Sequence, residues 1–445
     1  MIDRVVSFPD VRRGSSAGAR AKYSAVLICL ILLVGIGLTP MGDFLSVYAL
    51  KGQVGGDAGA RYSFLVRGAM VTGLVAAMLL DGRVRVSNWR VGALALLVGF
   101  MSCVSLANGG MDAKEFTEEI IAIAKVFSLF VYFTAFSELS DRQIEKVEAV
   151  MRVTLVIYAL AIVAGAAFSI DIFRSYRGET QIRAGYKGVI YAQNEASALL
   201  LSGFALICLG VLRRGWDTQS KGIIGLLFTA SFLLGTKAAV VSGLGVVAVY
   251  SYARYGLLKA TVRFTLTLMA LLLFALGVYY ASPAVHQAVD LSIQYFVYHR
   301  DHASEDAIAT VIMSGRNVKF VKVWEELSNE SFLPLLAGGY PTVRYPVEMD
   351  GPDLALIMGI PVILIYLLDL HRLYVLSPNG CIARYGKYFF LLLLMVACSA
   401  GHVLTSAIVA PYLAMIAALV HRWSESERLD ADRLDHGNDR KDGGV

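Results

Sequence analysis

The chain has 445 residues, of which 57% are hydrophobic and only 17% are charged, and its mean hydropathy is +0.61. Soluble domains carry about 25% charged residues, so this composition excludes an ordinary soluble protein and indicates an integral membrane protein. The net charge of +5 gives no indication of a nucleic-acid partner. The five cysteines show no metal-ligand spacing, so we expect them to pack as small apolar side chains.

Twelve apolar stretches are predicted to be membrane-spanning helices, since a span needs about 20 mostly apolar residues. In chain order they are 22–40, 62–80, 90–107, 116–136, 150–169, 190–211, 220–235, 237–253, 262–281, 353–370, 386–400 and 402–420. The first follows a basic leader without a small-residue cleavage site, so we expect it to be retained. The seventh and eighth share a tight turn at Thr236-Lys237, which also allows a broken or re-entrant pair.

Basic residues between the spans predict the orientation, because Lys and Arg favour short cytoplasmic loops. With the N-terminus in the cytoplasm, the basic clusters before residue 22, at 83–90 and at 254–263 lie on the cytoplasmic side. An even number of spans returns the C-terminus to that side. The predicted segments are nine spans over 1–281, a large periplasmic loop over 282–352, three spans over 353–420, and a charged, disordered cytoplasmic tail over 421–445.

Several basic residues nevertheless lie on the predicted periplasmic side, against the orientation bias. They are Arg174, Arg177, Arg183 and Lys187 in segment 170–189, and Arg300, Arg316, Lys319, Lys322 and Arg344 in the large loop. An anionic substrate approached from the outer leaflet would favour this placement. Contact with lipid headgroups is the alternative.

The segment 183–197 joins a basic loop to the polar first turns of a predicted span. Arg183 and Lys187 are suited to a diphosphate, Arg through its planar fork and Lys as a point charge. Asn194 is costly to expose to lipid, so we expect it to face the bundle interior, at a substrate or in an interhelical hydrogen bond. Lys237 stands at a predicted helix start, where free N–H groups also favour anions; snorkelling to the interface is the alternative.

The large loop carries a second polar group. Ser314-Gly315-Arg316 opens a helical pattern, and a capped helix start would suit Arg316 to a phosphate. This amphipathic run is either an ordinary surface helix or one that lies on the membrane beneath a lipid-linked substrate. Glu348, Asp350 and Asp353 follow before the tenth span. Carboxylates this close can act as or hold a general base, bind sugar hydroxyls or coordinate a hard cation; a solvated loop end is the alternative.

Two ionisable residues near or inside predicted spans complete the candidates. His402, at the start of the twelfth span, is a further candidate base, although a lone histidine at a membrane edge is more often structural. Arg67 lies inside the second span and must find a partner there, for which we expect a structural role. The sequence contains no P-loop, zinc-helix motif or nucleophile elbow.

The order of these motifs resembles the bacterial O-antigen polymerase and O-antigen ligase superfamily of polysaccharide-assembling membrane proteins. The resemblance rests on the Asn194 segment, Gly235-Thr236-Lys237, Ser314-Gly315-Arg316, Glu348-x-Asp350-x-x-Asp353 before Gly359-Ile360, and Gly401-His402. It covers about residues 180–415.

The resemblance implies an all-α polytopic membrane protein of the GT-C glycosyltransferase architecture in the bacterial inner membrane, with its active site facing the periplasm. The enzyme would be inverting, without metal or other cofactor, and would use an undecaprenyl-diphosphate-linked oligosaccharide. Besides membrane lipids, a chain-length regulator and a flippase of the same pathway are the expected partners. We assign substrate binding to Arg183, Lys187, Asn194, Lys237, Arg316 and Asp353, and catalysis to Glu348, Asp350 and His402.

Within this resemblance a polymerase is favoured over a ligase. Ligases of the superfamily place a histidine in the large loop as base, whereas here that loop offers only His286, His299 and His302, without a matching motif. A lipid-linked oligosaccharide flippase or transporter is the competing class, but the sequence shows no internal repeat and concentrates its polar residues in one loop. A multi-span peptidoglycan glycosyltransferase, which would differ in its acceptor, is a third reading.

Overall fold

The computed structural model describes the chain except for residues 1–14, 50–61, 81–85, 176–184, 330, 343–345, 377–379, 443–445 and parts of 282–312. Within the described residues the named elements are all helices, and an isolated bridge between Arg174 and Tyr186 is the only β-type pairing. Eight of these helices are long and apolar enough to cross a membrane. The chain is therefore an all-α protein with the helices of a multi-pass membrane protein.

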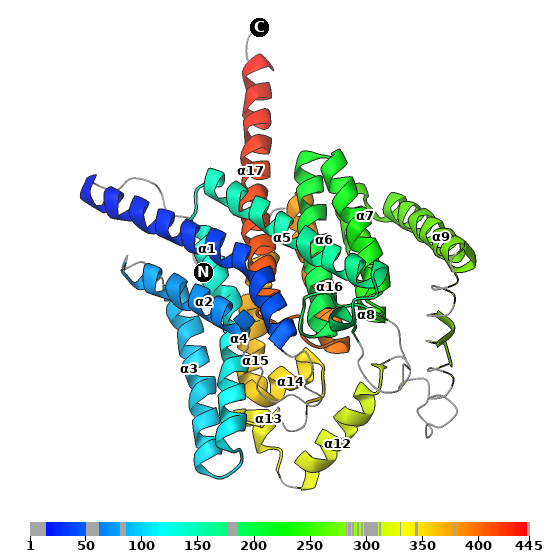
Figure 1. The fold of residues 1–445 in the computed structure, drawn as a ribbon. Helices are drawn as coiled ribbons and strands as arrows, with labels where there is room; N and C mark the ends of the chain where they lie inside the picture. The colour runs from blue at the N-terminus through cyan, green and yellow to red at the C-terminus, as the bar shows by residue number, and fades with distance from the viewer. Residues whose placement is uncertain are drawn as a thin grey trace.

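Five helices form the first part of the bundle (Figure 1). They are α1 Ser15–Ala49, α2 Tyr62–Leu80, α3 Val86–Ala107, α4 Ala113–Ser137 and α5 Asp141–Ala167. Asp112 fixes the start of α4 through a capping box, in which its side chain accepts from the Glu115 N–H at 2.7 Å and Glu115 accepts from the Asp112 N–H. Figure 1 shows the turn between α3 and α4 at one end of the bundle, and this end also carries the polar loops described below.

The middle of the chain supplies the centre of the bundle and its lipid-facing edge. Its elements are the short 3-10 helix Asp171–Phe173, α6 Gln193–Arg214, α7 Thr218–Leu233, α8 Lys237–Tyr255 and α9 Leu257–Ala281. Helix α6 is buried without interruption from Ala196 to Leu212, so it is the central helix. Helix α9 instead lies at the outside of the bundle with its leucines exposed, as expected for a helix that faces lipid (Figure 1).

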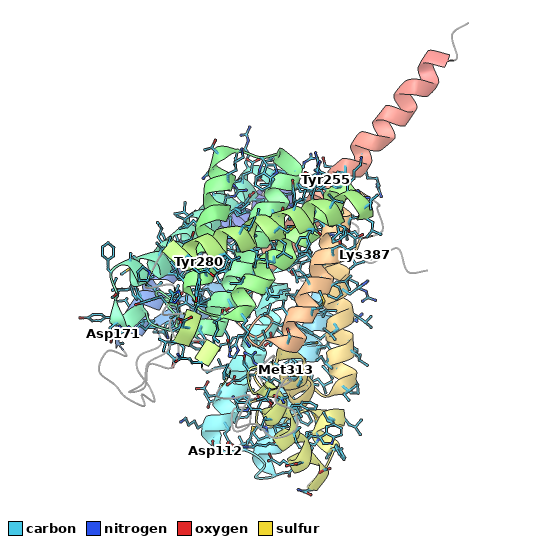
Figure 2. The ribbon with its side chains drawn as sticks, turned by 90° about the vertical axis from the view of Figure 1, so that its right-hand side faces the viewer. Asp112, Asp171, Tyr255, Tyr280, Met313 and Lys387 are labelled. Carbon is cyan, nitrogen blue, oxygen red and sulfur yellow. The ribbon has the colours of Figure 1, made fainter. Side chains whose placement is uncertain are left out.

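The C-terminal part contains the broken elements of the fold. They are α12 Arg316–Asn329, α13 Leu333–Ala337, α14 Asp350–Met358, α15 Ile360–Tyr374, α16 Cys381–Ser399 and α17 Ala410–Asp442. Figure 2 shows Met313, just before α12, near the end of the molecule where Asp112 lies, with Tyr255 at the opposite end. Helices α12 to α14 and the α3–α4 turn therefore share one end of the bundle.

Eight of the twelve predicted spans coincide with helices that are long and apolar enough to cross a membrane. The other four, 220–235, 237–253, 353–370 and 402–420, do not meet that criterion as single helices. The first two form the separate helices α7 and α8, joined through Gly235 at φ +72°. The total of twelve spans, the orientation and the GT-C architecture stay predictions.

Two predicted spans are interrupted in the structure. The tenth is broken at Gly359, whose φ is +77° and where a Cβ atom would come within 2.5 Å of the Leu336 carbonyl oxygen. The twelfth begins late, because residues 400–409 form an irregular loop and α17 starts only at Ala410. Both interruptions occur where polar loops meet the helix bundle.

The C-terminal tail differs from its predicted disorder, because α17 continues as one helix from the bundle to Asp442. Figure 1 shows its end projecting beyond the other helices. The segment after His421 contains five Asp and four Arg and has no apolar face to bury, but it also contains no proline that would interrupt the helix.

Candidate functional site

The start of α12, the turn before α14 and the loop 400–409 meet at one place. The Arg316 guanidinium donates to the Ser399 carbonyl at the end of α16, with an Nη1–O distance of 3.3 Å. One turn further along α12, the Lys319 ammonium forms an ion pair with Glu348. The structure thus brings the predicted pair Arg316 and Glu348 into one site, although 32 residues separate them in the sequence.

The Asp350 carboxylate joins the third segment to the other two. It is 2% exposed and accepts hydrogen bonds from the N–H groups of His402 (2.7 Å), Val403 (2.6 Å) and Leu404 (2.7 Å) and from the Thr405 hydroxyl (2.8 Å). Four donors satisfy the lone-pair positions of a carboxylate. Asp350 therefore holds the loop in place, and this geometry favours a positioning role over the predicted role of base.

Gly401 explains why the chain forms a loop here and not the start of a span. A Cβ atom at Gly401 would lie 2.6 Å from the Glu348 carbonyl oxygen, so the two segments pack backbone against backbone. The Asp350 carboxylate then takes the N–H groups of the next residues out of any helical pattern. Neither contact is readable from periodicity, which is why the predicted span 402–420 begins too early.

Strained backbone is concentrated at this site. Among the described residues four non-glycine residues have a left-handed φ, and three of them are here: Ser314 at +55°, Glu348 at +63° and His402 at +74°. Such conformations cost about 1–3 kcal/mol each and tend to cluster at functional sites. The fourth, Ser169, lies after α5. The strained backbone is therefore a local property of the three segments that meet here.

The candidate bases differ in the hydrogen-bond or ion-pair partners that their side chains already have. Glu348 is neutralised by Lys319, and the two side chains are 39% and 43% exposed. Asp353 accepts from the Val347 N–H at 2.9 Å, which fixes the turn before α14. The His402 Nδ1 is buried and has no hydrogen-bond partner among the described residues. His402 is thus the candidate whose side chain retains an unused nitrogen.

The N-terminal ends of α6 and α8 form the other half of the site. The Ser197 and Thr236 hydroxyls are 2.7 Å apart, and Thr236 also caps α8 by accepting from the Ala239 N–H. The loop before α6 packs on this end through the Tyr186 N–H, which donates to the Leu233 carbonyl at 2.8 Å. Lys237 begins α8 at this end.

A small cavity connects the two halves. It has a volume of about 10 Å³, close to the minimum for one water molecule. Asn194, Ser197 and Ser242 line one side, while Gly401 and Val403 line the other. The predicted binding residue Asn194 therefore shares a cavity with the loop that carries His402.

The remaining predicted residues are placed as follows. The Lys187 ammonium donates to the Tyr191 carbonyl and lies 5.5 Å from the centroid of that ring, so it is engaged within its own loop. Arg183 lies outside the described residues, as do Arg177, Arg300, Arg344, His299 and His302. His286 pairs with Asp290 at 3.1 Å and is not among the residues that form the site.

Two carboxylates that are not among the predicted site residues lie near the site, Glu195 half-buried and Glu119 fully buried. Glu195, in the first turn of α6, accepts from the Ser406 hydroxyl at 3.2 Å and so contacts the loop 400–409. Glu119, fully buried in α4, accepts from the Thr342 hydroxyl at 3.2 Å. The available signal was an acidic residue inside an apolar stretch, which is costly unless it has a partner.

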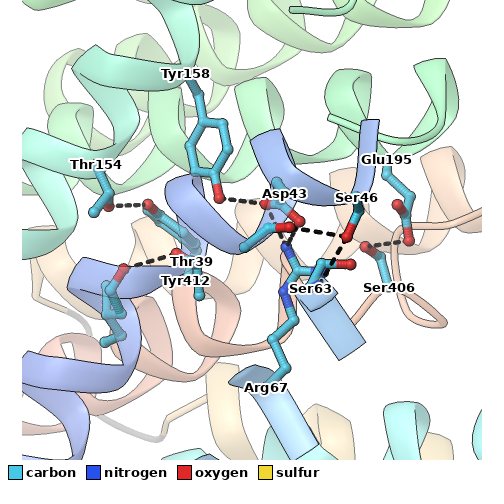
Figure 3. A network of polar contacts seen from close by, with 12 residues as sticks. Thr39, Asp43, Ser46, Ser63, Arg67, Thr154, Tyr158, Glu195, Ser406 and Tyr412 are labelled. Carbon is cyan, nitrogen blue, oxygen red and sulfur yellow. Dashed lines mark hydrogen bonds and ion pairs between the residues drawn. The ribbon is translucent and has the colours of Figure 1, made fainter. Parts of the chain in front are cut away.

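A separate charged network lies among α1, α2 and α5 (Figure 3). Arg67, the intramembrane residue that needed a partner, pairs with Asp43, and its Nη2 is 2.6 Å from both carboxylate oxygens. The Tyr158 hydroxyl donates to the same carboxylate at 2.5 Å. The Glu195–Ser406 contact lies beside this network in Figure 3. The expected structural role of Arg67 fits this geometry.

The chain matches no protein-family model and no curated protein.

Proposed function

We propose that the chain is a polysaccharide polymerase, which transfers a growing glycan from undecaprenyl diphosphate onto a lipid-linked repeat unit at the periplasmic face of the inner membrane. One observation carries the proposal most: Arg316, Glu348 and His402 converge on strained backbone at one end of a helical membrane bundle. Transfer from a lipid diphosphate requires cations for the leaving group and a base for the acceptor hydroxyl, and these adjoining segments carry both kinds of residue.

The reaction needs little from the protein besides charge and a base. The acceptor hydroxyl oxygen attacks the anomeric carbon, the bond from that carbon to the diphosphate oxygen breaks, and the diphosphate leaves with the electron pair. The configuration inverts because attack and departure occur on opposite faces. Preorganised cations stabilise the charge that develops on the leaving group. A general base removes the hydroxyl proton and contributes about 10²–10⁴-fold.

We assign these tasks to residues of the two halves. Arg316 is the principal diphosphate ligand, since it projects from the first residue of α12 towards the end of α16. Lys237, at the start of α8, is a further cation for the same group. Lys187, in the loop before α6, would join it by exchanging its bond to the Tyr191 carbonyl for one to the diphosphate. His402 is the base. Asp350 and Asp353 position these groups by binding the backbone of the loops around them.

The test uses a deletion strain of the bacterium that carries the gene, complemented with variants whose membrane levels are checked. Surface and lipid-linked glycans are then resolved by size. Arg316→Ala is compared with Lys322→Ala, which removes the same charge from an exposed position of the same helix. We expect wild type and Lys322→Ala to restore a ladder of chain lengths, while Arg316→Ala leaves single repeat units.

Other outcomes replace the proposal with its alternatives. Full-length chains that accumulate on undecaprenyl diphosphate in the deletion strain would identify a ligase. Repeat units that remain on the cytoplasmic leaflet would identify a flippase. Equal ladders from Arg316→Ala and Lys322→Ala would remove Arg316 from the site.

A further inference from the structure

Helix α12 carries one apolar stripe, of which only half is buried. The face formed by Val323 and Leu327 is buried against the protein, in a cluster with Tyr340, Val347 and other residues. Phe320 and Trp324 belong to the same apolar pattern but are exposed. A helix that only packs on a domain buries its apolar stripe, so the exposed half of this stripe requires another explanation.

The exposed face continues into α13 as one aromatic patch, which we define as Phe320, Trp324, Phe332, Leu333 and Leu336. All five side chains are between 40% and 65% exposed. Their rings are in contact: the Trp324 ring centroid is 6.2 Å from that of Phe320 and 5.3 Å from that of Phe332. Exposed apolar side chains that form a contiguous group mark an interaction site, unlike single exposed residues.

The opposite side of α12 is mainly polar. It carries Lys322, Glu325 and Asn329 with Val318 among them, all exposed. The helix therefore presents one face to the protein, one aromatic face outward and one face suited to water and headgroups. Basic residues beside an aromatic and leucine-rich face are typical of helices that lie in a membrane interface. Tryptophan in particular is enriched at that depth.

The position of α12 in the molecule fits such an interface. Figure 1 shows α12 level with the ends of α3 and α4 that meet at their connecting turn. Helices α3 and α4 are both long and apolar enough to span the membrane, so their joined end marks where a spanning helix leaves the hydrocarbon. Helix α12 lies across the bundle at this depth.

We propose that the aromatic patch inserts into the interface of the lipid leaflet at this end and anchors α12 to the membrane. The occupant is the phospholipid boundary, because aromatic rings, leucines and a flanking lysine complement acyl chains and anionic headgroups together. The anchor has a consequence for the neighbouring site. Arg316 and Lys319 belong to the same helix, so the depth of α12 sets the height at which their charges stand above the bilayer. The proposal does not depend on the polymerase reaction.

The test measures the depth of Trp324 in the intact protein. The chain has four tryptophans. Replacing Trp89, Trp216 and Trp423 with phenylalanine leaves Trp324 as the only tryptophan. The variant is reconstituted in phospholipid nanodiscs whose acyl chains carry bromine near the headgroup or near the chain end. We expect fluorescence to fall about twofold with the shallow bromines and less with the deep ones. A variant that retains only Trp89, 68% exposed at the start of the candidate span in α3, is the lipid-facing control.

Two results would overturn the anchor. Trp324 quenched by iodide in solution but not by bromolipid would place the patch in water. Quenching by neither would place it under a protein partner or a second copy of the chain. If the triple variant does not fold, the difference in bromolipid quenching between wild type and Trp324→Phe measures the same contact; no difference would equally refute the proposal.

Discussion

Two buried carboxylates, Asp350 and Asp43, differ in the groups that donate hydrogen bonds to them. Asp350 is bound by three backbone N–H groups and the Thr405 hydroxyl, at 2.6–2.8 Å. Asp43 is bound by the side chains of Arg67 and Tyr158, at 2.5–2.6 Å. Both are almost inaccessible to solvent.

The difference separates a structural centre from a candidate functional one. At Asp43 a carboxylate and a guanidinium neutralise each other and tie three helices together. At Asp350 the carboxylate is used to shape a loop, and the loop holds His402 in a left-handed conformation with an unused ring nitrogen. A buried charge is therefore a weak indication of function by itself. The unused groups that it positions are the stronger indication.

The largest effect is expected from breaking the Asp43 centre. Arg67→Ala leaves the Asp43 carboxylate buried with only the Tyr158 hydroxyl, and such a change costs about 3–5 kcal/mol. We expect the variant to lose thermal stability in detergent and to reach the membrane in smaller amounts.

The matched control replaces both charges. In Asp43→Leu/Arg67→Met no unpaired charge remains, and replacing a buried ion pair by apolar residues is often neutral. Recovery of most of the lost stability would establish a structural pair. If stability returned but polymer synthesis did not, the pair would have a functional role, and the contrast with Asp350 would fail.

His402→Asn tests the other centre. Asparagine tolerates the left-handed backbone but cannot serve as the base, so we expect polymerisation to fall about 10²–10⁴-fold while stability changes little. The rate of repeat-unit consumption in purified membranes measures the effect. Ser169→Asn is the control, because Ser169 has a similar φ of +50° outside the site and should retain full activity. Unchanged activity in His402→Asn would exclude His402 as the base.

The helices themselves are largely predictable from the sequence, because apolar stretches of sufficient length determine them. The breaks are not. The span is interrupted at Gly359 because the backbone there packs directly against α13. A Cβ atom on Gly359 would lie 2.5 Å from the Leu336 carbonyl oxygen. Asp43 was missed because the predicted first span ends at residue 40, whereas α1 continues to Ala49. The carboxylate that this extension buries is compensated by Arg67 and Tyr158, both distant in sequence.

The candidate site shows the same division: residue types are readable from the sequence, whereas contacts between distant segments are not. Residue types suited to phosphates and proton transfer indicated Arg316, Glu348 and His402, and the structure brings together the three segments that carry them. Their division of labour depends on contacts across about 50 residues of chain, such as the bond from the His402 N–H to Asp350. Periodicity and spacing carry no information about contacts of this kind.

Asp350→Asn is expected to have a smaller effect than the two preceding changes. The amide keeps one acceptor oxygen but turns an NH₂ group towards backbone donors, and hydrogen bonds to a charged group contribute about 1.5–3 kcal/mol. The loop 400–409 should exchange its amide hydrogens faster, while the bundle around α6 is unaffected. Hydrogen exchange measures this directly. Unchanged protection at residues 402–404 would mean that Asp350 does not hold the loop, and its predicted role as base would regain support.

Glu348→Gln is expected to have the smallest effect on stability. The ion pair with Lys319 joins side chains that are 39% and 43% exposed, and exposed pairs contribute about 0–1 kcal/mol. The left-handed backbone is equally strained with glutamine, so the melting temperature should hardly change. The informative quantity is the ratio of its activity to that of His402→Asn, measured at equal membrane levels. If Glu348→Gln is the less active of the two, Glu348 is the base that takes the proton of the acceptor hydroxyl. Lys319 would then modulate the basicity of Glu348, and His402, like Asp350, would serve only to shape the loop.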